Sequence, residues 1–265
     1  MVQADSQIDS ITSQLIMKPE TRLRIAHISD VHISPDAALQ GGIDTRKNLA
    51  AVFGNLEGKE IDIIVFGGDL AADRGEVESY QWISEHLDQL QLSYLIVLGN
   101  HDIKRNVQET FNVESVLEDE LVFHKKLKGV NLIGLESSKK KVSEEQLEWL
   151  LSIQSSLEGP VLLFIHHPPV FCDCDFMDAK HSLENREKVM AIIQKIPNLK
   201  GVFCGHYHTE KTVLTSTSRV FITPSTVLQA SQIGIEFKEA SRLPGWRQID
   251  MDDSGLRTCV HYLSS

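Results

Sequence analysis

Cysteine is scarce in this chain: there are four in 265 residues, and no two of them stand at a CxxC spacing. Four cysteines are few for a disulfide framework, and the CxxC pairs typical of thiolate zinc sites are missing. The four residues are Cys172, Cys174, Cys204 and Cys259. We therefore expect a reduced chain that works in the cytoplasm.

Positive charge is also in short supply. There are 26 Lys and Arg residues against 37 Asp and Glu residues, which gives a formal net charge of -11. Proteins that bind nucleic acids as polyanions rely on clustered Lys and Arg, so we expect no nucleic-acid partner. An anionic substrate would have to find positive charge locally, and bound metal ions are the obvious source.

Long hydrophobic runs are missing, and so is a basic segment followed by an apolar stretch and a cleavage site. The sequence therefore predicts neither a membrane span nor a secretion signal. Residues 1–21 are polar, with Ile8, Ile11 and Leu15 at helical spacing, and we expect a tail or short helix there. Repeats and Pro/Ser-rich linkers are also lacking. We predict a single domain over 22–265, with C-terminal strands from about residue 211.

Short apolar strands alternate with amphipathic helices from residue 22 onward, which predicts an α/β fold with a partly parallel sheet. We expect strands at 23–29, 61–66, 94–98, 131–135, 161–165 and 201–204, and near 213, 219–222, 246–251 and 256–263. Helices are expected at 45–56, 76–90, 107–120 (irregular), 143–157 and 183–196. Ser143 and Gln146 form the pattern of a capping box at the start of one of these helices.

Five of the predicted strands are followed at once by side chains that can bind metal ions. The motifs are Asp30-Val31-His32, Gly67-Gly68-Asp69, Gly99-Asn100-His101-Asp102, His166-His167 and Gly205-His206-Tyr207-His208. Each motif taken alone is typical of an ordinary turn. Together they lie at the same ends of consecutive strands, where α/β proteins bind ligands. The pattern therefore predicts a metal site, with His167 expected to be structural.

The seven candidate ligands combine imidazole nitrogen with carboxylate and amide oxygen, and no thiolate joins them. They are Asp30, His32, Asp69, Asn100, His166, His206 and His208. Such a set favours iron or manganese, with zinc or cobalt as alternatives, over calcium or magnesium. Seven ligands are too many for one catalytic zinc. They fit two ions, with Asp69 as the bridging carboxylate.

The five motifs, in this order, resemble the signature of the calcineurin-like metallophosphoesterases across about residues 22–210. Within that superfamily the chain resembles the bacterial class III cyclic-nucleotide phosphodiesterases of the cyclic-AMP type. The closer likeness rests on Gly68-Asp69-Leu70-Ala71-Ala72-Asp73, His181-Ser182-Leu183, Thr223-Pro224-Ser225-Thr226 and Pro244-Gly245-Trp246-Arg247.

This resemblance implies a four-layer α/β/β/α sandwich of two mixed sheets. It also implies a first metal ion held by Asp30, His32, Asp69 and His208, and a second held by Asp69, Asn100, His166 and His206. The implied reaction is hydrolysis of 3',5'-cyclic nucleotides, cAMP to AMP, by in-line attack of a metal-bound hydroxide on phosphorus.

The remaining roles also follow from the resemblance. Asn100, His101 and His206 would contact the substrate, and Asn100 would take up charge on the phosphoryl oxygens. His101 would act beside the leaving oxygen, oriented by Asp102, while Asp73 could support a ligand from behind.

Alternatives to this hypothesis differ in substrate or in class. The same ligands would serve a metallophosphoesterase acting on 2',3'-cyclic nucleotides, glycerophosphodiesters or phosphomonoesters, and the fold also supports a non-catalytic metal-binding scaffold. Tyr207, Phe171 and Trp246 are candidates to stack on a base. The expected partner is a small cyclic nucleotide, and the chain is expected to be a monomer or a homodimer.

Overall fold

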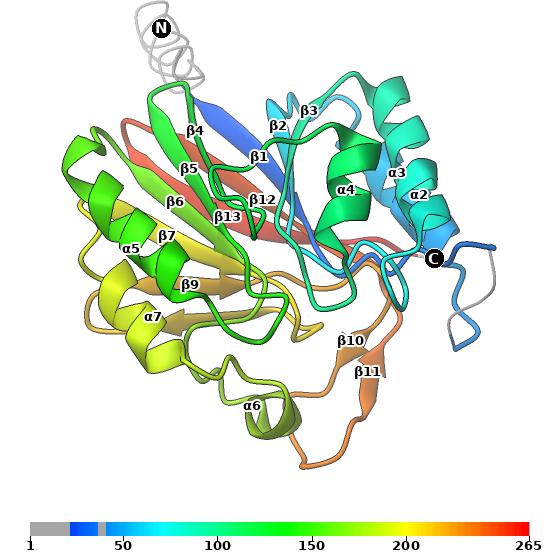
Figure 1. Cartoon of the computed structure of the whole chain (residues 1–265). Helices are drawn as coiled ribbons and strands as arrows, with labels where there is room; N and C mark the ends of the chain where they lie inside the picture. Colours follow the sequence, from blue (N-terminus) through cyan, green and yellow to red (C-terminus); the bar gives the residue numbers. More distant parts are fainter. Residues whose placement is uncertain (1–21, 37–40, 265) are drawn as a thin grey trace, which may run out of the picture.

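The structure is a computed structural model that describes residues 22–36 and 41–264 (Figure 1). The short helix or tail expected at the N-terminus lies outside the described residues. None of the helices in the described part of the chain has the length and apolar character that crossing a membrane requires.

The first sheet has the strand order β13-β12-β1-β2-β3. Its strands are β1 (Leu23–Ile28), β2 (Ile63–Phe66), β3 (Ser93–Ile96), β12 (Gly245–Asp252) and β13 (Gly255–Tyr262). β1, β2 and β3 are parallel to one another, whereas β12 runs antiparallel to β1, and β13 antiparallel to β12. The C-terminal hairpin therefore completes the sheet that the N-terminal strand begins.

The second sheet has the strand order β4-β5-β6-β7-β9-β8. Its strands are β4 (Phe123–Leu127), β5 (Val130–Leu135), β6 (Val161–Ile165), β7 (Leu199–Cys204), β8 (Lys211–Leu214) and β9 (Arg219–Ile222). The four central strands are parallel, and β4 and β8 are antiparallel edges. A separate small ribbon pairs β10 (Gln229–Ala230) with β11 (Glu239–Ser241).

Helices cover the outer face of each sheet, so that the molecule has four layers (Figure 1). On the first sheet lie α2 (Thr45–Leu56), α3 (Val77–Leu90) and α4 (Lys104–Phe111); on the second lie α5 (Glu144–Ile153) and α7 (Arg186–Ile193). One apolar core fills the space between the sheets, and one lies under each helical layer. The predicted α/β/β/α sandwich of two mixed sheets is confirmed.

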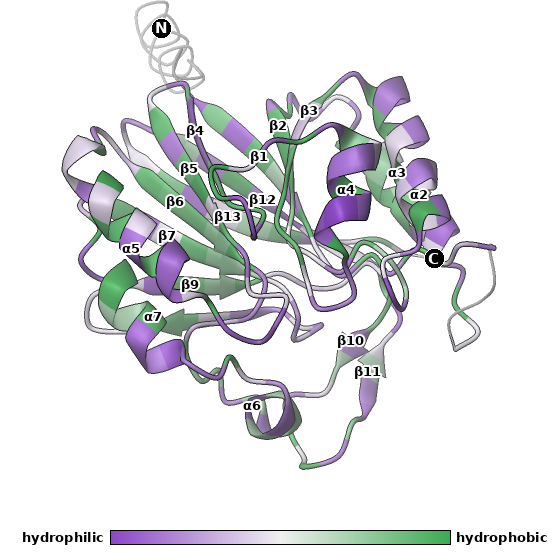
Figure 2. Ribbon diagram, viewed as in Figure 1, coloured by the Kyte–Doolittle hydropathy of each residue, from purple (hydrophilic) through white to green (hydrophobic). Residues whose placement is uncertain are grey.

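The helices form where the apolar spacing predicts them, because each buries one stripe against a sheet. In α2 the buried stripe contains Leu49, Val52 and Phe53, and the Asp44 side chain caps the helix by accepting from the Lys47 N–H at 2.9 Å. Figure 2 shows the strands of both sheets mainly in the hydrophobic colour, while α4 presents a hydrophilic surface to the viewer.

The structure corrects three of the predicted elements. The irregular helix predicted at 107–120 is the shorter α4, which ends where Asn112 takes a left-handed φ of 51°. The helix predicted at 183–196 is shorter at both ends. Only half of the capping box forms: Ser143 accepts from the Gln146 N–H, but the Gln146 side chain is buried and pairs with the backbone of Glu136.

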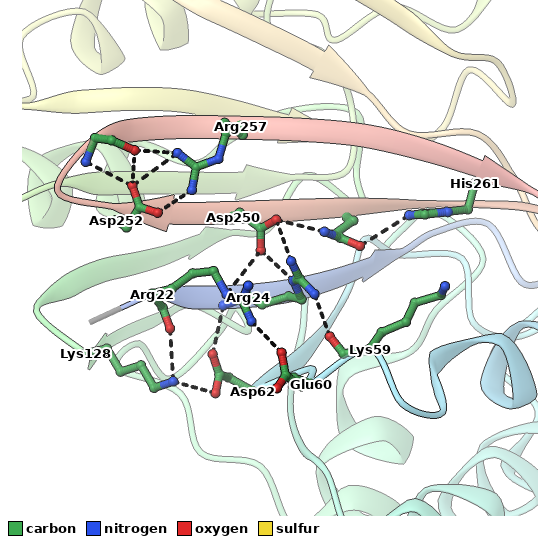
Figure 3. Close-up of polar contacts among 12 residues, drawn as sticks. Arg22, Arg24, Lys59, Glu60, Asp62, Lys128, Asp250, Asp252, Arg257 and His261 are labelled. Carbon is green, nitrogen blue, oxygen red and sulfur yellow. Dashed lines mark hydrogen bonds and ion pairs between the residues drawn. The ribbon is translucent and has the colours of Figure 1, made fainter. Parts of the chain in front are cut away.

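Charged contacts hold neighbouring strands, and one pair of strand ends from the two sheets, together at the end where β1 begins (Figure 3). Arg24 of β1 forms a two-pronged ion pair with Asp250 of β12, at 2.6 and 3.1 Å. Lys128 lies in the turn between β4 and β5, and Asp62 lies just before β2. The Lys128 ammonium donates to the Asp62 carboxylate at 2.6 Å. This end of the sandwich is therefore held by ion pairs, and the candidate ligands lie at the opposite ends of the same strands.

Candidate metal centre

The candidate ligands stand on sharp turns directly after parallel strands of both sheets. Five of them have positive φ angles, which residues other than glycine seldom adopt. These are Asp30 at 54°, His32 at 42°, Asp69 at 54°, His206 at 66° and His208 at 47°. Such backbone strain persists only when the surroundings hold it, and it is concentrated at functional sites.

The first group of ligand atoms comes from the turn after β1 and the turn after β7. The Nε2 atoms of His32 and His208 lie 3.1 Å apart, and His208 Nε2 lies 3.5 Å from an oxygen of Asp30. One ligand atom from each of the three residues lies within 4.8 Å of the other two. The three atoms are therefore close enough together to hold one ion.

The second group combines Asp69 after β2 with His166 after β6 and His206 after β7. His166 Nε2 lies 3.3 Å from Asp69 Oδ2, and His32 Nε2 lies 3.7 Å from the same oxygen. Asp69 therefore lies between the two groups. A further overlapping group joins His32, Asp69 and His101.

Hydrogen bonds from the other ring nitrogens orient two of these imidazoles. His166 Nδ1 lies 2.7 Å from the Gly67 carbonyl oxygen, and His206 Nε2 lies 3.0 Å from that of His181. A carbonyl oxygen only accepts, so both of these nitrogens carry the proton. The ring nitrogens left to bind a metal are His166 Nε2, which is buried beside the Asp69 carboxylate, and His206 Nδ1.

The electrostatics of the group fit cation binding. Burial lowers the pKa of His32 to about 4 and that of His208 to about 3, so both imidazoles are neutral at pH 7. Burial also raises the pKa of Asp30 to about 7. Burial opposes protonation of His166, yet the carboxylates of Asp69 and Asp30 raise its pKa to about 9. The buried carboxylates thus attract a positive charge to the place between them.

Close backbone approach makes glycine necessary beside two of the ligands. A Cβ on Gly205 would overlap Ser29 Oγ and lie 2.6 Å from an oxygen of Asp30. A Cβ on Gly99 would overlap the backbone nitrogen and carboxylate of Asp69 and lie 2.7 Å from its Cγ. Glycine at these positions is thus a requirement of packing.

The ligand groups open into a cavity of about 270 Å³. Six residues of its wall are polar residues of the predicted site: His32, Asp69, Asn100, His101, His206 and His208. No Lys or Arg lines this cavity among the residues that the structure describes. A phosphate group placed here would meet no Lys or Arg among these residues, and metal ions held by the ligand groups would supply positive charge.

Comparison with known families identifies the chain. The family profile described as calcineurin-like phosphoesterase matches residues 23–210, the stretch that contains every candidate ligand. The chain belongs to the calcineurin-like phosphoesterases. The predicted membership and the predicted enzyme class, a phosphoesterase, are therefore confirmed.

Similar proteins show the same assignment. A Fibrobacter succinogenes protein named "probable cyclic nucleotide phosphodiesterase" is 34% identical over 241 residues, covering 91% of this phosphoesterase and 94% of the relative. The "3',5'-cyclic adenosine monophosphate phosphodiesterase CpdA" of Escherichia coli K12 is 30% identical over 257 residues, covering 92% and 91%. A solved dimetal phosphatase from Danio rerio shares the fold, with a TM-score of 0.64, 13% identity and coverage of 91% and 99%.

Asn100 and His101, two of the residues expected to contact the substrate, lie at the wall of this phosphoesterase's cavity. The backbone N–H of His101 donates to Asp69 Oδ1 at 2.9 Å, and its Nδ1 lies 3.1 Å from the carbonyl oxygen of Asp73. The support that Asp73 gives is thus a backbone contact to His101. Its carboxylate is 76% exposed and does not support a ligand.

The role predicted for Asp102 is wrong in one respect: its carboxylate does not orient the His101 ring. It is buried and accepts from the N–H groups of Leu70, Ala71 and Gly99, at 3.0, 3.2 and 2.9 Å, and from the Tyr80 hydroxyl at 3.0 Å. Asp102 therefore fixes the turns that carry Asp69 and Asn100. The three backbone amides, which need acceptors, take up the carboxylate, while Nδ1 of the His101 ring has the Asp73 carbonyl as its partner.

His167 has a structural role, as expected. Its Nδ1 lies 3.0 Å from Ser137 Oγ, which also accepts from its backbone N–H at 3.1 Å. The ring lies against that of His206, with centroids 3.9 Å apart. None of the three ligand groups found among the described residues includes His167.

The three aromatic residues considered for stacking on a base, each of a kind more often found in the core or at a rim, lie elsewhere. Tyr207 is buried and donates to Asp178, and Trp246 is buried and donates to Asn55. Phe171 is exposed but lines a different cavity. The aromatic residues of the site cavity are instead Phe176 and Phe237. The sequence carried no signal for them, because they come from a short helix and an irregular loop outside the motifs.

Proposed function

We propose that this phosphoesterase hydrolyses 3',5'-cyclic nucleotides, converting cAMP to AMP, at a centre of two metal ions. The observation that carries the proposal is the position of Asp69, whose carboxylate lies between two groups of ligand atoms. The substrate is supported by the names of the two relatives that cover nine-tenths of the chain.

In this proposal Asp30, His32, Asp69 and His208 hold the first ion, and Asp69, Asn100, His166 and His206 hold the second. Iron and manganese suit these ligands best, and zinc or cobalt could replace them. When bound, such a pair supplies the positive charge that activates water and stabilises an in-line displacement at phosphorus. The atoms left to bind the second ion are Nε2 of His166 and Nδ1 of His206, because the other ring nitrogen of each donates to a carbonyl oxygen.

The side chains around the centre then have separate tasks. The Asn100 amide, at the cavity wall, donates to the phosphoryl oxygens as their charge grows. The carbonyl of Asp73 accepts from Nδ1 of His101, which leaves Nε2 as the atom that, when it also carries a proton, gives that proton to the leaving O3'. Asp102 keeps the backbone under these residues in place through its contacts with amides.

A substrate panel tests the proposal. Protein loaded with manganese or iron is assayed with 3',5'-cAMP, 3',5'-cGMP, 2',3'-cAMP, a glycerophosphodiester, a phosphomonoester and bis-p-nitrophenyl phosphate, and its metal content is measured in parallel. We expect two ions per chain and the highest kcat/KM with a 3',5'-cyclic nucleotide. Turnover of 3',5'-cAMP no faster than that of the generic diester would contradict the substrate assignment.

The same panel separates the rival hypotheses. A preference for glycerophosphodiesters, 2',3'-cyclic nucleotides or phosphomonoesters would keep the reaction class and change the substrate. Bound metal without turnover of any ester would indicate a non-catalytic scaffold. We further propose a cytoplasmic monomer or homodimer; the free state of all four cysteines supports the location.

A further inference from the structure

One side of the site cavity is apolar and aromatic. Beyond the candidate ligands and His101, the cavity is lined by Phe176, Met177, His181, Leu228, Ala230 and Phe237. We call Phe176 and Phe237 the aromatic wall. Neither belongs to a ligand motif, and neither is needed to hold a metal ion. A cavity with one polar and one apolar half fits a ligand that is itself divided in this way.

The two rings of the aromatic wall come from different parts of the chain. Phe176 lies on α6 (Asp175–Lys180), and Phe237 lies in the loop between β10 and β11. Their centroids are 6.0 Å apart with an interplanar angle of 70°, and the ring of His181 is 5.2 Å from that of Phe176. The side chain of Phe237 is 54% exposed, so much of its apolar surface is uncovered beside a polar site.

Backbone hydrogen bonds hold the aromatic wall in position. The N–H of Asp175 donates to the Gln232 carbonyl at 3.0 Å, and the N–H of Gly234 donates to the Asp175 carboxylate at 2.8 Å. The N–H of Ala230 donates to the carbonyl of His208, a candidate ligand, at 2.6 Å. Figure 1 shows α6, β10 and β11 together at one end of the molecule. The wall is thus built before any ligand arrives.

We propose that the aromatic wall binds the nucleobase of the substrate, by stacking, while the phosphate occupies the polar half of the cavity. This inference rests on the proposed function and names the part of the substrate that the protein recognises. A planar base offers the wall a π face, whereas the glycerol of a glycerophosphodiester offers none. Stacking on an aromatic side chain depends little on which base is bound, because every base has a π face.

Stacking without polar readout also predicts a broad base preference. Among the described residues of the apolar half, His181 alone carries a polar side chain. Few hydrogen-bonding groups are therefore available to distinguish adenine from guanine. We expect kcat/KM values for 3',5'-cAMP and 3',5'-cGMP within about tenfold of each other.

Phe237→Ala tests the role of the wall, because the side chain is half exposed and its removal spares the core. In manganese-loaded full-length protein we expect KM for 3',5'-cAMP to rise about tenfold, with kcat within about twofold of wild type. Ribose 3',5'-cyclic phosphate, which lacks the base, should show no change in KM. Ile235→Ala is the matched control, since Ile235 lies on the same loop, is 78% exposed and does not line the cavity.

A binding measurement supplies a second readout. By calorimetry, Phe237→Ala should weaken binding of AMP about tenfold and leave binding of ribose 5-phosphate unchanged. Phe176→Leu, which keeps an apolar side chain where the ring packs against the core, should weaken AMP binding in the same direction. Equal losses with and without the base would overturn the inference, because they would show a general disturbance of the site.

The failure of the proposed function would give a different result. If wild type turns over bis-p-nitrophenyl phosphate but not 3',5'-cAMP, the substrate assignment fails. The wall is then tested by AMP as an inhibitor of that turnover. A Ki for AMP that rises about tenfold in Phe237→Ala would still support the base subsite, and an unchanged Ki would overturn it.

Discussion

Gly99→Ala is the substitution that tests most directly how the backbone positions Asp69. Gly99 has no positive φ angle, so an alanine there strains nothing in the backbone itself. The added methyl group would overlap the backbone nitrogen and carboxylate of Asp69 and lie 2.7 Å from Asp69 Cγ. The variant therefore isolates a steric effect on the carboxylate that is proposed to bridge the two ions.

The magnitude follows from what can move. Overpacking of a tight interior costs about 1–3 kcal/mol, and here one obstacle is backbone, which cannot rotate away. We expect the upper end, a loss of about 3 kcal/mol in the free energy of unfolding. Relief must displace the Asp69 carboxylate together with the backbone that carries it, and a misplacement of about 1 Å in a catalytic site lowers turnover roughly 100-fold.

Three measurements follow the effect: urea unfolding of the metal-free protein, metal content after dialysis against a limiting amount of manganese, and kcat/KM for bis-p-nitrophenyl phosphate. Gly54→Ala is the control, because a Cβ at Gly54 meets nothing within 4 Å. Gly54 lies within α2, where alanine should stabilise the protein by about 0.5–1 kcal/mol and leave activity unchanged.

The reasoning is refuted if Gly99→Ala binds metal and turns over substrate like the Gly54→Ala control. In that case Asp69 would not be held by the contact with Gly99, or would not be shared between two ions. Loss of stability with normal metal content would be informative as well. It would locate the strain in the backbone rather than in the carboxylate.

Two further predictions concern other parts of the molecule. His101→Ala should lower kcat at least tenfold while metal content stays at the wild-type level, because His101 is proposed to act on the leaving oxygen; loss of metal, measured by elemental analysis, would contradict that role. Asp250→Asn should cost about 2 kcal/mol of unfolding free energy at pH 7, since it breaks the ion pair with Arg24. Burial opposes the charge on Asp250, but hydrogen bonds from Arg24 and Gln248 outweigh it and lower its pKa. The ion pair therefore stabilises the protein above the unfolded pKa of about 3.9. The difference between wild type and variant in the free energy of unfolding, measured with urea, should shrink as the pH falls below about 4. A difference that persists at lower pH would count against the ion pair as its source.

Much of the fold could be predicted because strand ends and helix stripes are local features of the sequence. The apolar run before Gly99 and the stripe of Leu49, Val52 and Phe53 depend only on neighbours in the chain. The candidate ligands could be grouped for the same reason, since parallel strands bring their carboxyl ends to one edge.

The contacts that the sequence did not reveal depend on distant partners. Asp102 follows His101 in the chain, yet its carboxylate binds amides of the Asp69 turn and the hydroxyl of Tyr80 on α3. Phe237 lines the site cavity on a loop that is tied to Asp175 of α6. No local pattern records either arrangement, so both required the tertiary structure.

The position of β12 has a consequence for how the family match should be interpreted. The match ends at residue 210, but β12 begins at Gly245 and lies between β1 and β13. A chain cut after the last histidine motif would keep every candidate ligand and leave β1 with a bare edge. It would also lack Trp246 and Ile249, which are fully buried. The stretch that identifies the chemistry is therefore shorter than the stretch that must fold to perform it.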